Sequence, residues 1–187
     1  MMRHLVSEAI WNFDLNEAVA TLPVWRRVEV MRYRREVDRR VRVVAHRLLR
    51  QLLDEEFGLI LDTLRVARTE HGKPFFPDYP DVHFNISHCD VAVACAVATS
   101  PVGIDVELVT ELDMDVARRV LNDDELHKVL TAPRPDVAFT RLWTIKESYL
   151  KMLGTGLIDD IANLTVPTGR THTTEAPTSR YAYTIAT

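Results

Sequence analysis

The feature that most constrains the fold is a long apolar stripe at helical spacing, from about residue 28 to residue 57. Its apolar side chains fall every three or four positions, at Val37, Val41, Val44, Leu48 and Leu52. This spacing predicts one long helix with a single apolar face, and the glycine at position 58 is placed to end it. Arginines form a second stripe on another face of the same predicted helix, at Arg32, Arg35, Arg39 and Arg42. On its own, that stripe is equally compatible with a solvated helix face.

Short β-prone runs occupy much of the remaining chain. Residues 82–86 and 91–98 are predicted to be two strands joined by a tight polar turn, and residues 102–108 a further strand. Weaker runs at 64–68, 164–167 and 181–185 predict short strands, with a Thr-rich loop between the last two. Residues 114–130 favour a helix, and a second long helix is expected from Asp136 until Gly154 stops it. No repeat or linker divides the chain into independent domains.

Composition limits the class of protein. The chain has 187 residues, 47% of them hydrophobic and 27% charged, which suits one compact domain or two small half-domains packed as one. Because the sequence shows no secretion signal, we expect Cys89 and Cys95 to be reduced thiols in a cytoplasmic protein. The longest apolar run, residues 91–98, is far shorter than a membrane span.

Positive charge is concentrated in one segment, although the net charge of the chain is −4. Residues 26–50 contain ten arginines against three acidic residues. A basic segment in an acidic chain indicates an anionic ligand or partner that meets one face of the protein. It does not favour nucleic-acid binding, which usually makes the whole domain basic.

Two carboxylates alternate with apolar residues in the segment Gly103-Ile104-Asp105-Val106-Glu107. Asp105 and Glu107 would share one face of a strand, because successive strand side chains point to opposite faces. Carboxylates on one face repel each other unless a cation lies between them. Oxygen ligands of this kind suit Mg²⁺ completed by water and substrate phosphates. The alternative is an exposed strand edge with solvated acids.

A ridge of aromatic and charged side chains follows the second long helix. Phe139, Trp143, Glu147 and Lys151 fall at every fourth position, and Lys146 flanks the ridge. A helix salt bridge between Glu147 and Lys151 would explain that pair alone. An aromatic ridge that leads to a carboxylate flanked by two lysines is less common, and it marks a candidate site.

Two turns could meet phosphate groups. Ser87 and His88 cannot easily form a nucleophile–base pair, because side chains of neighbouring residues point apart. Both can instead bind a phosphate at the end of a strand, helped by backbone N–H groups. The turn Gly72-Lys73-Pro74 presents a lysine on a rigid turn, which alone indicates little.

In their order and spacing, four motifs resemble the 4′-phosphopantetheinyl transferases, in the larger surfactin-synthetase-activating class. The motifs are Gly72-Lys73-Pro74, Phe84-Asn85-Ile86-Ser87-His88, Gly103-Ile104-Asp105-Val106-Glu107, and the stretch from Phe139 to Lys151 with the trailing Leu153-Gly154-Thr155-Gly156-Leu157. The resemblance covers about residues 32–157. It implies an α+β fold of two similar α+β halves packed as a pseudo-dimer. Residues 1–100 would bind nucleotide phosphates, and residues 101–187 would carry the metal site and the catalytic helix.

The resemblance also implies an activity of the holo-[acyl-carrier-protein] synthase type. The 4′-phosphopantetheine group of coenzyme A would pass to a serine of an apo acyl or peptidyl carrier protein, releasing adenosine 3′,5′-bisphosphate. Asp105, Glu107 and Glu147 would hold Mg²⁺, with Mn²⁺ as the alternative ion. Glu147 and Lys151 would be catalytic, with Glu147 taking the proton of the serine hydroxyl. Asp105, acting through a bound water, is the competing proton acceptor.

The residues expected to contact coenzyme A follow from the same motifs. They are Lys73, Ser87 and His88 for the phosphates of the nucleotide, and Lys146 and Lys151 for the pyrophosphate. The nucleotide-phosphate arginine of the family aligns with Val41, so the neighbouring Arg40 is taken as its substitute.

The expected partner is an acidic carrier protein. The protein itself is expected to be a monomer that binds neither nucleic acid nor a membrane. Two other functions use the same residues. A metal-dependent phosphodiesterase or nuclease would employ the carboxylates with water as the acceptor. A non-catalytic module would dock carrier proteins or coenzyme A without transfer.

Overall fold

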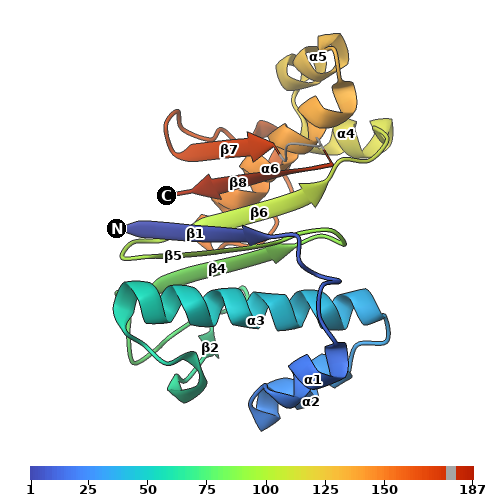
Figure 1. Cartoon of the computed structure of the whole chain (residues 1–187). Helices are drawn as coiled ribbons and strands as arrows, with labels where there is room; N and C mark the ends of the chain where they lie inside the picture. Colours follow the sequence, from blue (N-terminus) through green and yellow to red (C-terminus); the bar gives the residue numbers. More distant parts are fainter. Residues whose placement is uncertain (176–179) are drawn as a thin grey trace.

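Two antiparallel three-stranded sheets, each packed against one long helix, form the framework of the protein (Figure 1). The computed structural model describes residues 1–175 and 180–187, apart from the side chain of Glu175. Helices packed on antiparallel sheets confirm the predicted α+β class. Within the described ranges, no helix combines the length and the apolar character needed to cross a membrane.

The first sheet belongs to the N-terminal half and has the strand order β1-β5-β4. Its strands are β1 (Met2–Ser7), β4 (His83–His88) and β5 (Val93–Ala98). The helices of this half are α1 (Leu15–Ala20), α2 (Val24–Met31) and the long α3 (Glu36–Phe57). A short helical turn η1 (Leu61–Thr63) and the paired two-residue strands β2 (Ala67–Arg68) and β3 (Pro74–Phe75) link α3 to β4.

The second sheet has the order β6-β8-β7, and its elements follow in the same sequence as those of the first half. Its strands are β6 (Gly103–Leu108), β7 (Thr171–Glu175) and β8 (Tyr181–Ala186). Between β6 and β7 lie the helices α4 (Met114–Val120), α5 (Asp123–Thr131) and the long α6 (Pro135–Leu153), and then the turn η2 (Ile161–Asn163). Each half therefore runs from a first strand through helices to two closing strands, the last of which takes the middle of the sheet.

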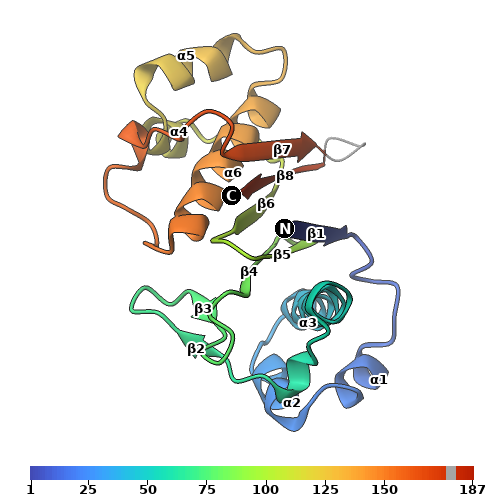
Figure 2. The same ribbon diagram turned by 90° about the vertical axis from the view of Figure 1, so that its left-hand side faces the viewer.

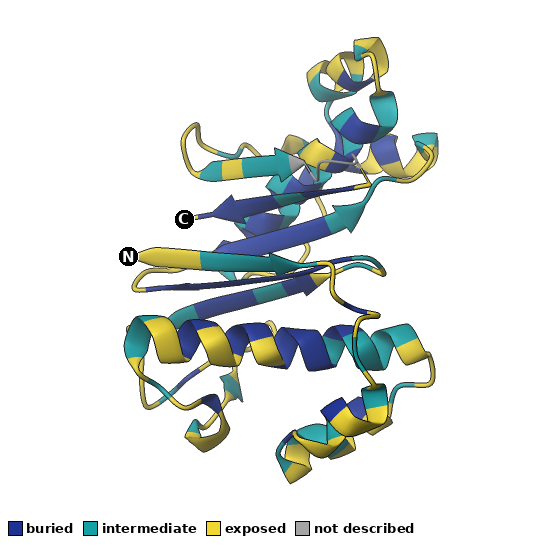
Figure 3. Ribbon diagram, in the orientation of Figure 1, coloured by how far each residue is buried: buried dark blue, intermediate teal, exposed yellow. Residues whose placement is uncertain are grey.

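Alternation along β5 decides how the two halves pack. Val93, Cys95 and Val97 join the apolar core beneath α3, whereas Ala94 and Ala96 join the core shared with β6 and β8. Small alanine side chains on this second face let the two sheets approach closely. Figure 2 shows α3 against the first sheet and α6 against the second, and Figure 3 shows buried residues concentrated in the central strands between them.

Gly103 fixes the distance between α6 and β6. A Cβ atom at this position would overlap the carbonyl oxygen of Ser148 and the backbone nitrogen of Met152. Only glycine therefore allows the backbone of α6 to lie this close to the start of β6. This approach brings the last turns of α6 next to the carboxylates of the strand.

Two helices that the sequence predicted as continuous are broken. The expected helix over residues 28–57 is divided between α2 and α3, because the chain leaves the helix at Tyr33. The main-chain carbonyl oxygen of Tyr33 accepts a hydrogen bond from Arg39 Nε at 2.7 Å, and the ring of Tyr33 lies under the guanidinium of Arg42. The expected helix over residues 114–130 is divided at Asn122, which forms a capping box with Glu125. The single arginine stripe was therefore wrong, since Arg32 lies outside α3.

Other strand and turn predictions had mixed outcomes. The strands over 82–86, 91–98 and 102–108 are confirmed as β4, β5 and β6, and Gly58 ends α3 with φ +64°. The last predicted strand is β8, but residues 164–167 form no strand, and β7 lies in the segment predicted to be a Thr-rich loop. Part of that loop, residues 176–179, lies outside the described residues. β1 was not predicted, because its sequence lacks a clear apolar alternation.

We expect Gly103→Ala to lower the free energy of unfolding by about 1–3 kcal/mol, because α6 must move away from β6 to make room for the methyl group. Urea denaturation followed by circular dichroism measures the change. Ser100→Ala, at an exposed position just before the strand, is the control and should leave stability nearly unchanged. Equal stability of the two variants would contradict the packing argument.

Candidate functional site

A buried carboxylate lies where the two halves meet. Asp105 of β6 is fully buried, and its Oδ1 accepts hydrogen bonds from Ser87 Oγ of β4 at 2.8 Å and from Lys151 Nζ of α6 at 2.5 Å. Lys151 Nζ also donates to Ser87 Oγ at 3.0 Å. One carboxylate therefore joins a strand of the first half to a strand and a helix of the second.

Asn85 holds β4 and β6 in register beside this carboxylate. Its side-chain oxygen accepts the backbone N–H of Ile104 at 2.9 Å, and both groups are buried. Asn85 and Ser87 point toward the second half because they alternate with Phe84 and Ile86, which pack in the core under α3. Asn85 was not among the predicted site residues. Its place in the motif before Ser87, on the same strand face, was the signal available for it.

Two further carboxylates surround Asp105. Burial, and then the charge of Asp105, raise the pKa of Glu107 to about 7, against the opposing effects of Lys151 and a hydrogen bond with the Trp143 side chain. Burial also raises the pKa of Glu147, which Lys151 lowers in part. Two members of the predicted ridge of α6 thus contact β6, since Trp143 contacts Glu107 and Lys151 contacts Asp105.

Lys73 ties the Gly-Lys-Pro turn of the first half to the end of α6. Its ammonium group donates to the carbonyl oxygens of Val102 at 3.1 Å, Lys151 at 2.6 Å and Met152 at 2.8 Å. Carbonyls at a helix C-terminus lack partners within the helix, and a lysine there satisfies them. Burial lowers the pKa of Lys73. To bind a phosphate, Lys73 would have to exchange one of these carbonyl partners.

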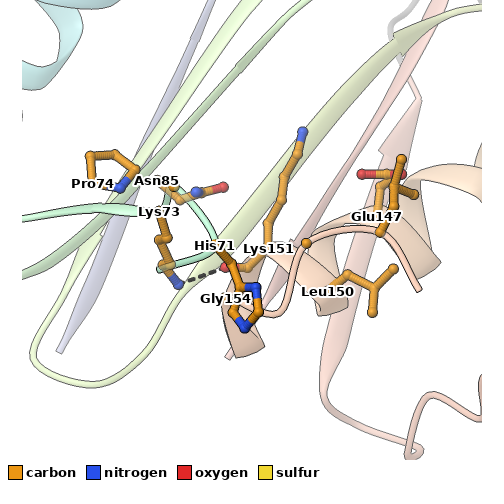
Figure 4. A pocket seen from close by; sticks show the side chains of 11 residues that line it. His71, Lys73, Pro74, Asn85, Glu147, Leu150, Lys151 and Gly154 are labelled. Carbon is orange, nitrogen blue, oxygen red and sulfur yellow. Dashed lines mark hydrogen bonds between the residues drawn. The ribbon is translucent and has the colours of Figure 1, made fainter. Parts of the chain in front are cut away.

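A cavity of about 230 Å³ opens beside this contact (Figure 4). Figure 4 shows Lys73, Glu147 and Lys151 on its wall, with a hydrogen bond from Lys73 to the main chain of Lys151. Its other lining residues come from both halves: His71, Gly72, Pro74, Asn85, Leu150, Gly154, Gly156 and Leu157. Cationic groups therefore meet an apolar wall next to the carboxylates.

A second cavity of about 420 Å³ lies between α2, α3 and the other face of β4. Its wall includes His88, Arg42 and Tyr33. Arg42 Nη1 lies 3.1 Å from His88 Nε2, and the guanidinium stacks on the ring of Tyr33 at 3.6 Å from its centroid. Since an arginine can only donate, His88 Nε2 accepts. Burial and the charges of Arg42 and Lys151 lower the pKa of His88, which agrees with a neutral ring.

The structure does not bring Arg40 to either cavity. Its guanidinium bonds to Glu36 at 2.7 Å and to the carbonyl oxygens of Ile10 and Phe13, so it anchors the N-terminal segment on the far side of α3. The expected contact of Arg40 with a nucleotide phosphate is therefore not supported by this geometry, and Arg42, two residues later, lines the larger cavity instead. The signal was helical spacing, because Arg42 shares a face of α3 with His46, four residues later, and His46 also lines the cavity.

Lys146 is also absent from the site. Its ammonium group is buried on another face of α6 and bonds to Glu125 and to three backbone carbonyl oxygens. Adjacent helix residues point about 100° apart, so Lys146 cannot share the face of Glu147 and Lys151. The expected contact of Lys146 with a pyrophosphate is not supported by this geometry.

The donor set nevertheless suits a divalent cation. Among the residues that the structure describes, no three acidic, histidine or cysteine side chains are gathered closely enough to hold a metal ion as they stand. However, the Oδ2 atom of Asp105 is buried without a hydrogen-bond partner. Mg²⁺ usually takes one or two carboxylates and completes its shell with water and phosphate, so Asp105, with Glu107 and Glu147 nearby, fits it.

Comparison with known proteins identifies the family of this chain. The family model for the N-terminal part of 4′-phosphopantetheinyl transferases matches residues 9–100, and the model of the 4′-phosphopantetheinyl transferase superfamily matches residues 101–185. The chain belongs to the 4′-phosphopantetheinyl transferase superfamily. The boundary between the two matches falls between β5 and β6, where the first sheet gives way to the second.

Curated relatives in this superfamily include several bacterial transferases. The 4′-phosphopantetheinyl transferase Sfp of Bacillus subtilis (strain 168) is 32% identical over 134 residues, which are 71% of this chain and 60% of the relative. The transferase gsp of Aneurinibacillus migulanus is 37% identical over 128 residues, or 67% of this chain and 53% of the relative. The transferase psf-1 of Bacillus pumilus is 31% identical over 142 residues, or 75% and 61%. The chain thus spans little more than half the length of these relatives.

In buffer without divalent cations, we expect the Glu107→Gln variant to have a larger free energy of unfolding than the wild type, and we expect this difference to increase with pH. The folded protein raises the pKa of Glu107 from 4.5 to about 7, so the wild type loses stability as pH rises through this window and the carboxyl ionises. Glutamine cannot ionise. Urea denaturation of both proteins at acidic, neutral and mildly alkaline pH measures the difference, and a difference independent of pH would contradict the burial argument.

Proposed function

We propose that this chain transfers the 4′-phosphopantetheine group of coenzyme A to a serine of an apo acyl or peptidyl carrier protein, in the manner of holo-[acyl-carrier-protein] synthases. The observation that carries the proposal is the buried contact of Asp105 with Ser87 and Lys151, where the segments matched by the two family models meet. A buried carboxylate paired with a lysine, with the carboxylates of Glu107 and Glu147 nearby, suits the handling of a charged pyrophosphate. Such a reaction depends on positioning and on charge neutralisation.

The residues around Asp105 divide the work. Lys151 and the Ser87 hydroxyl would contact the pyrophosphate oxygens and orient the phosphorus under attack. Glu147 would accept the proton of the carrier serine, because its raised pKa brings it nearer to neutral pH than an exposed carboxylate. Asp105 acting through a water remains the competing acceptor. Lys151, beside Asp105, would neutralise the negative charge that develops on the leaving adenosine 3′,5′-bisphosphate.

Asp105, Glu107 and Glu147 would hold Mg²⁺, or Mn²⁺ in its place, with the partnerless Oδ2 of Asp105 as the first ligand. The bound ion would neutralise pyrophosphate charge and stabilise the departing phosphate. Lys151 would then share Asp105 with the cation.

The two halves would bind different parts of coenzyme A. Residues 1–100 would bind the nucleotide phosphates through His88, Arg42 and the turn with Lys73, and residues 101–187 would supply the carboxylates and the catalytic helix. Both cavities border Pro74, so a single ligand could extend from one to the other. The exposed arginines near the start of α3 support an acidic carrier protein as the partner. We further propose that the protein is a monomer, because one chain supplies both sheets and the site between them. We also propose a cytoplasmic location, in keeping with the free thiols of Cys89 and Cys95.

Intact-protein mass spectrometry of an apo acyl carrier protein, incubated with this protein, coenzyme A and Mg²⁺, tests the proposal. We expect the carrier to gain the mass of one phosphopantetheine arm, and chelation of the metal or the Glu147→Gln variant to reduce the rate by about a hundredfold or more. Breakdown of coenzyme A without transfer would favour the phosphodiesterase alternative. Binding of coenzyme A without transfer to any carrier type would favour the non-catalytic module.

Two neighbouring arginines give a matched pair of variants. We expect Arg42→Ala to raise the KM for coenzyme A about tenfold, because the guanidinium faces the larger cavity, and to lower stability less than Arg40→Ala does, because it loses only its contacts with His88 and Tyr33. Arg40→Ala should instead lower the free energy of unfolding by about 1–3 kcal/mol, because it releases two backbone carbonyls and Glu36. Steady-state kinetics and urea denaturation of both variants measure the contrast, and an Arg40→Ala protein with the larger KM effect would reverse the assignment.

A further inference from the structure

Lys146 is 1% exposed, yet it is a charged side chain with no place in the proposed chemistry. Its Nζ atom lies within hydrogen-bond distance of four oxygens from three other segments. They are Val120 O at 2.8 Å, Glu125 Oε2 at 2.7 Å, Ile161 O at 3.0 Å and Ala162 O at 3.0 Å. A buried ammonium group is stable only when it is paired in this way.

The four oxygens connect α6 to the segments on both sides of it in the chain. Val120 ends α4, and Glu125 belongs to the capping box that begins α5, where its Oε2 also accepts the backbone N–H of Asn122 at 3.0 Å. Ile161 and Ala162 belong to the turn η2. Lys146 therefore fixes the position of η2 against the middle of α6.

The turn η2 ends a loop that borders the smaller cavity. The loop, residues 154–160, leaves the C-terminus of α6, where Lys73 holds the last carbonyls from the first half. Gly154, Gly156 and Leu157 of this loop line the cavity together with Glu147 and Lys151. Residues 155–160 are exposed, so apolar burial does not hold them between the two lysine contacts.

We propose that Lys146 is a positioning residue, which holds the loop of residues 154–160 as a wall of the cavity that receives coenzyme A. This inference rests on the proposed transfer activity for the identity of the ligand, but the anchoring itself does not depend on it. Without the ammonium group, Glu125 and three carbonyls lose a shared donor, and η2 has less to keep it on α6. A loosened wall weakens binding of the substrate before it affects the carboxylates, because Glu147 lies on another face of α6 and Asp105 and Glu107 lie on β6.

The test compares Lys146→Met and Glu125→Gln with the control Lys128→Met. Lys128 is an exposed lysine of α5, so its loss removes the same charge without touching η2. We expect Lys146→Met to raise the KM for coenzyme A about tenfold, with a smaller change in kcat and an unchanged KM for the carrier protein. Glu125→Gln keeps an oxygen acceptor but removes the charge, so its effect should be smaller and in the same direction.

Hydrogen exchange of the substrate-free protein gives a second readout. We expect amide exchange of residues 154–163 to become faster in Lys146→Met, with β6 and β8 unchanged, and to stay at the wild-type rate in Lys128→Met. If Lys146→Met does not fold, the KM for coenzyme A and the exchange of residues 154–163 are measured in Glu125→Gln instead. Wild-type exchange and an unchanged KM for coenzyme A would overturn the proposal, as would a fall in kcat alone. If the wild-type protein showed no transfer activity, the proposed function would be wrong. The exchange experiment would still test whether Lys146 holds η2 and the loop of residues 154–160 in place.

Discussion

The ion pair between Asp105 and Lys151 is the contact on which the arrangement of this protein depends. A carboxylate with no solvent exposure is costly to bury unless a cation and hydrogen-bond donors meet it. Here the cation comes from α6 and the hydroxyl donor, Ser87, comes from β4. The need to satisfy one buried charge thus requires the end of α6, β6 and the first half of the chain to stay together.

The same contact explains why the proposed site lies between the halves and not within one of them. Gly103 lets α6 approach β6, and Asn85 holds the edge of β6 beside β4. Lys73 then closes the arrangement from the first half by binding the last carbonyls of α6. Each of these groups is polar or small, and each acts at a place where two backbones come close. The alanines of β5 allow the two sheets to pack at a distance that keeps these contacts together.

Three buried or half-buried lysines show how one residue type takes different roles. Lys151 pairs with a carboxylate at the site, Lys73 binds carbonyls at a helix end, and Lys146 joins three segments on the far side of α6. Their positions in motifs did not separate these roles. For Lys146, the direction of the side chain from the helix was the deciding factor, and for Lys73 it was the position of a helix end remote in sequence. A lysine within a motif can therefore serve to hold the site together without contacting the ligand.

Much of the framework could be predicted from sequence alone, because it depends on local patterns. Apolar spacing located α3 and α6, β-branched runs located β4, β5 and β6, and strand alternation placed Asp105 and Glu107 on one face. What the sequence could not determine were contacts that form only in the folded chain: the pairing of β1 with β5, the stacking of Tyr33 under Arg42 where the helix is interrupted, and the position of Arg42, and not Arg40, at the larger cavity. Those outcomes depend on which partners a side chain finds in the folded protein. The sequence by itself determined which residues carry charge and on which element they lie, and only the tertiary structure decided which charges meet, because burial and pairing energies arise between segments that are far apart in the chain.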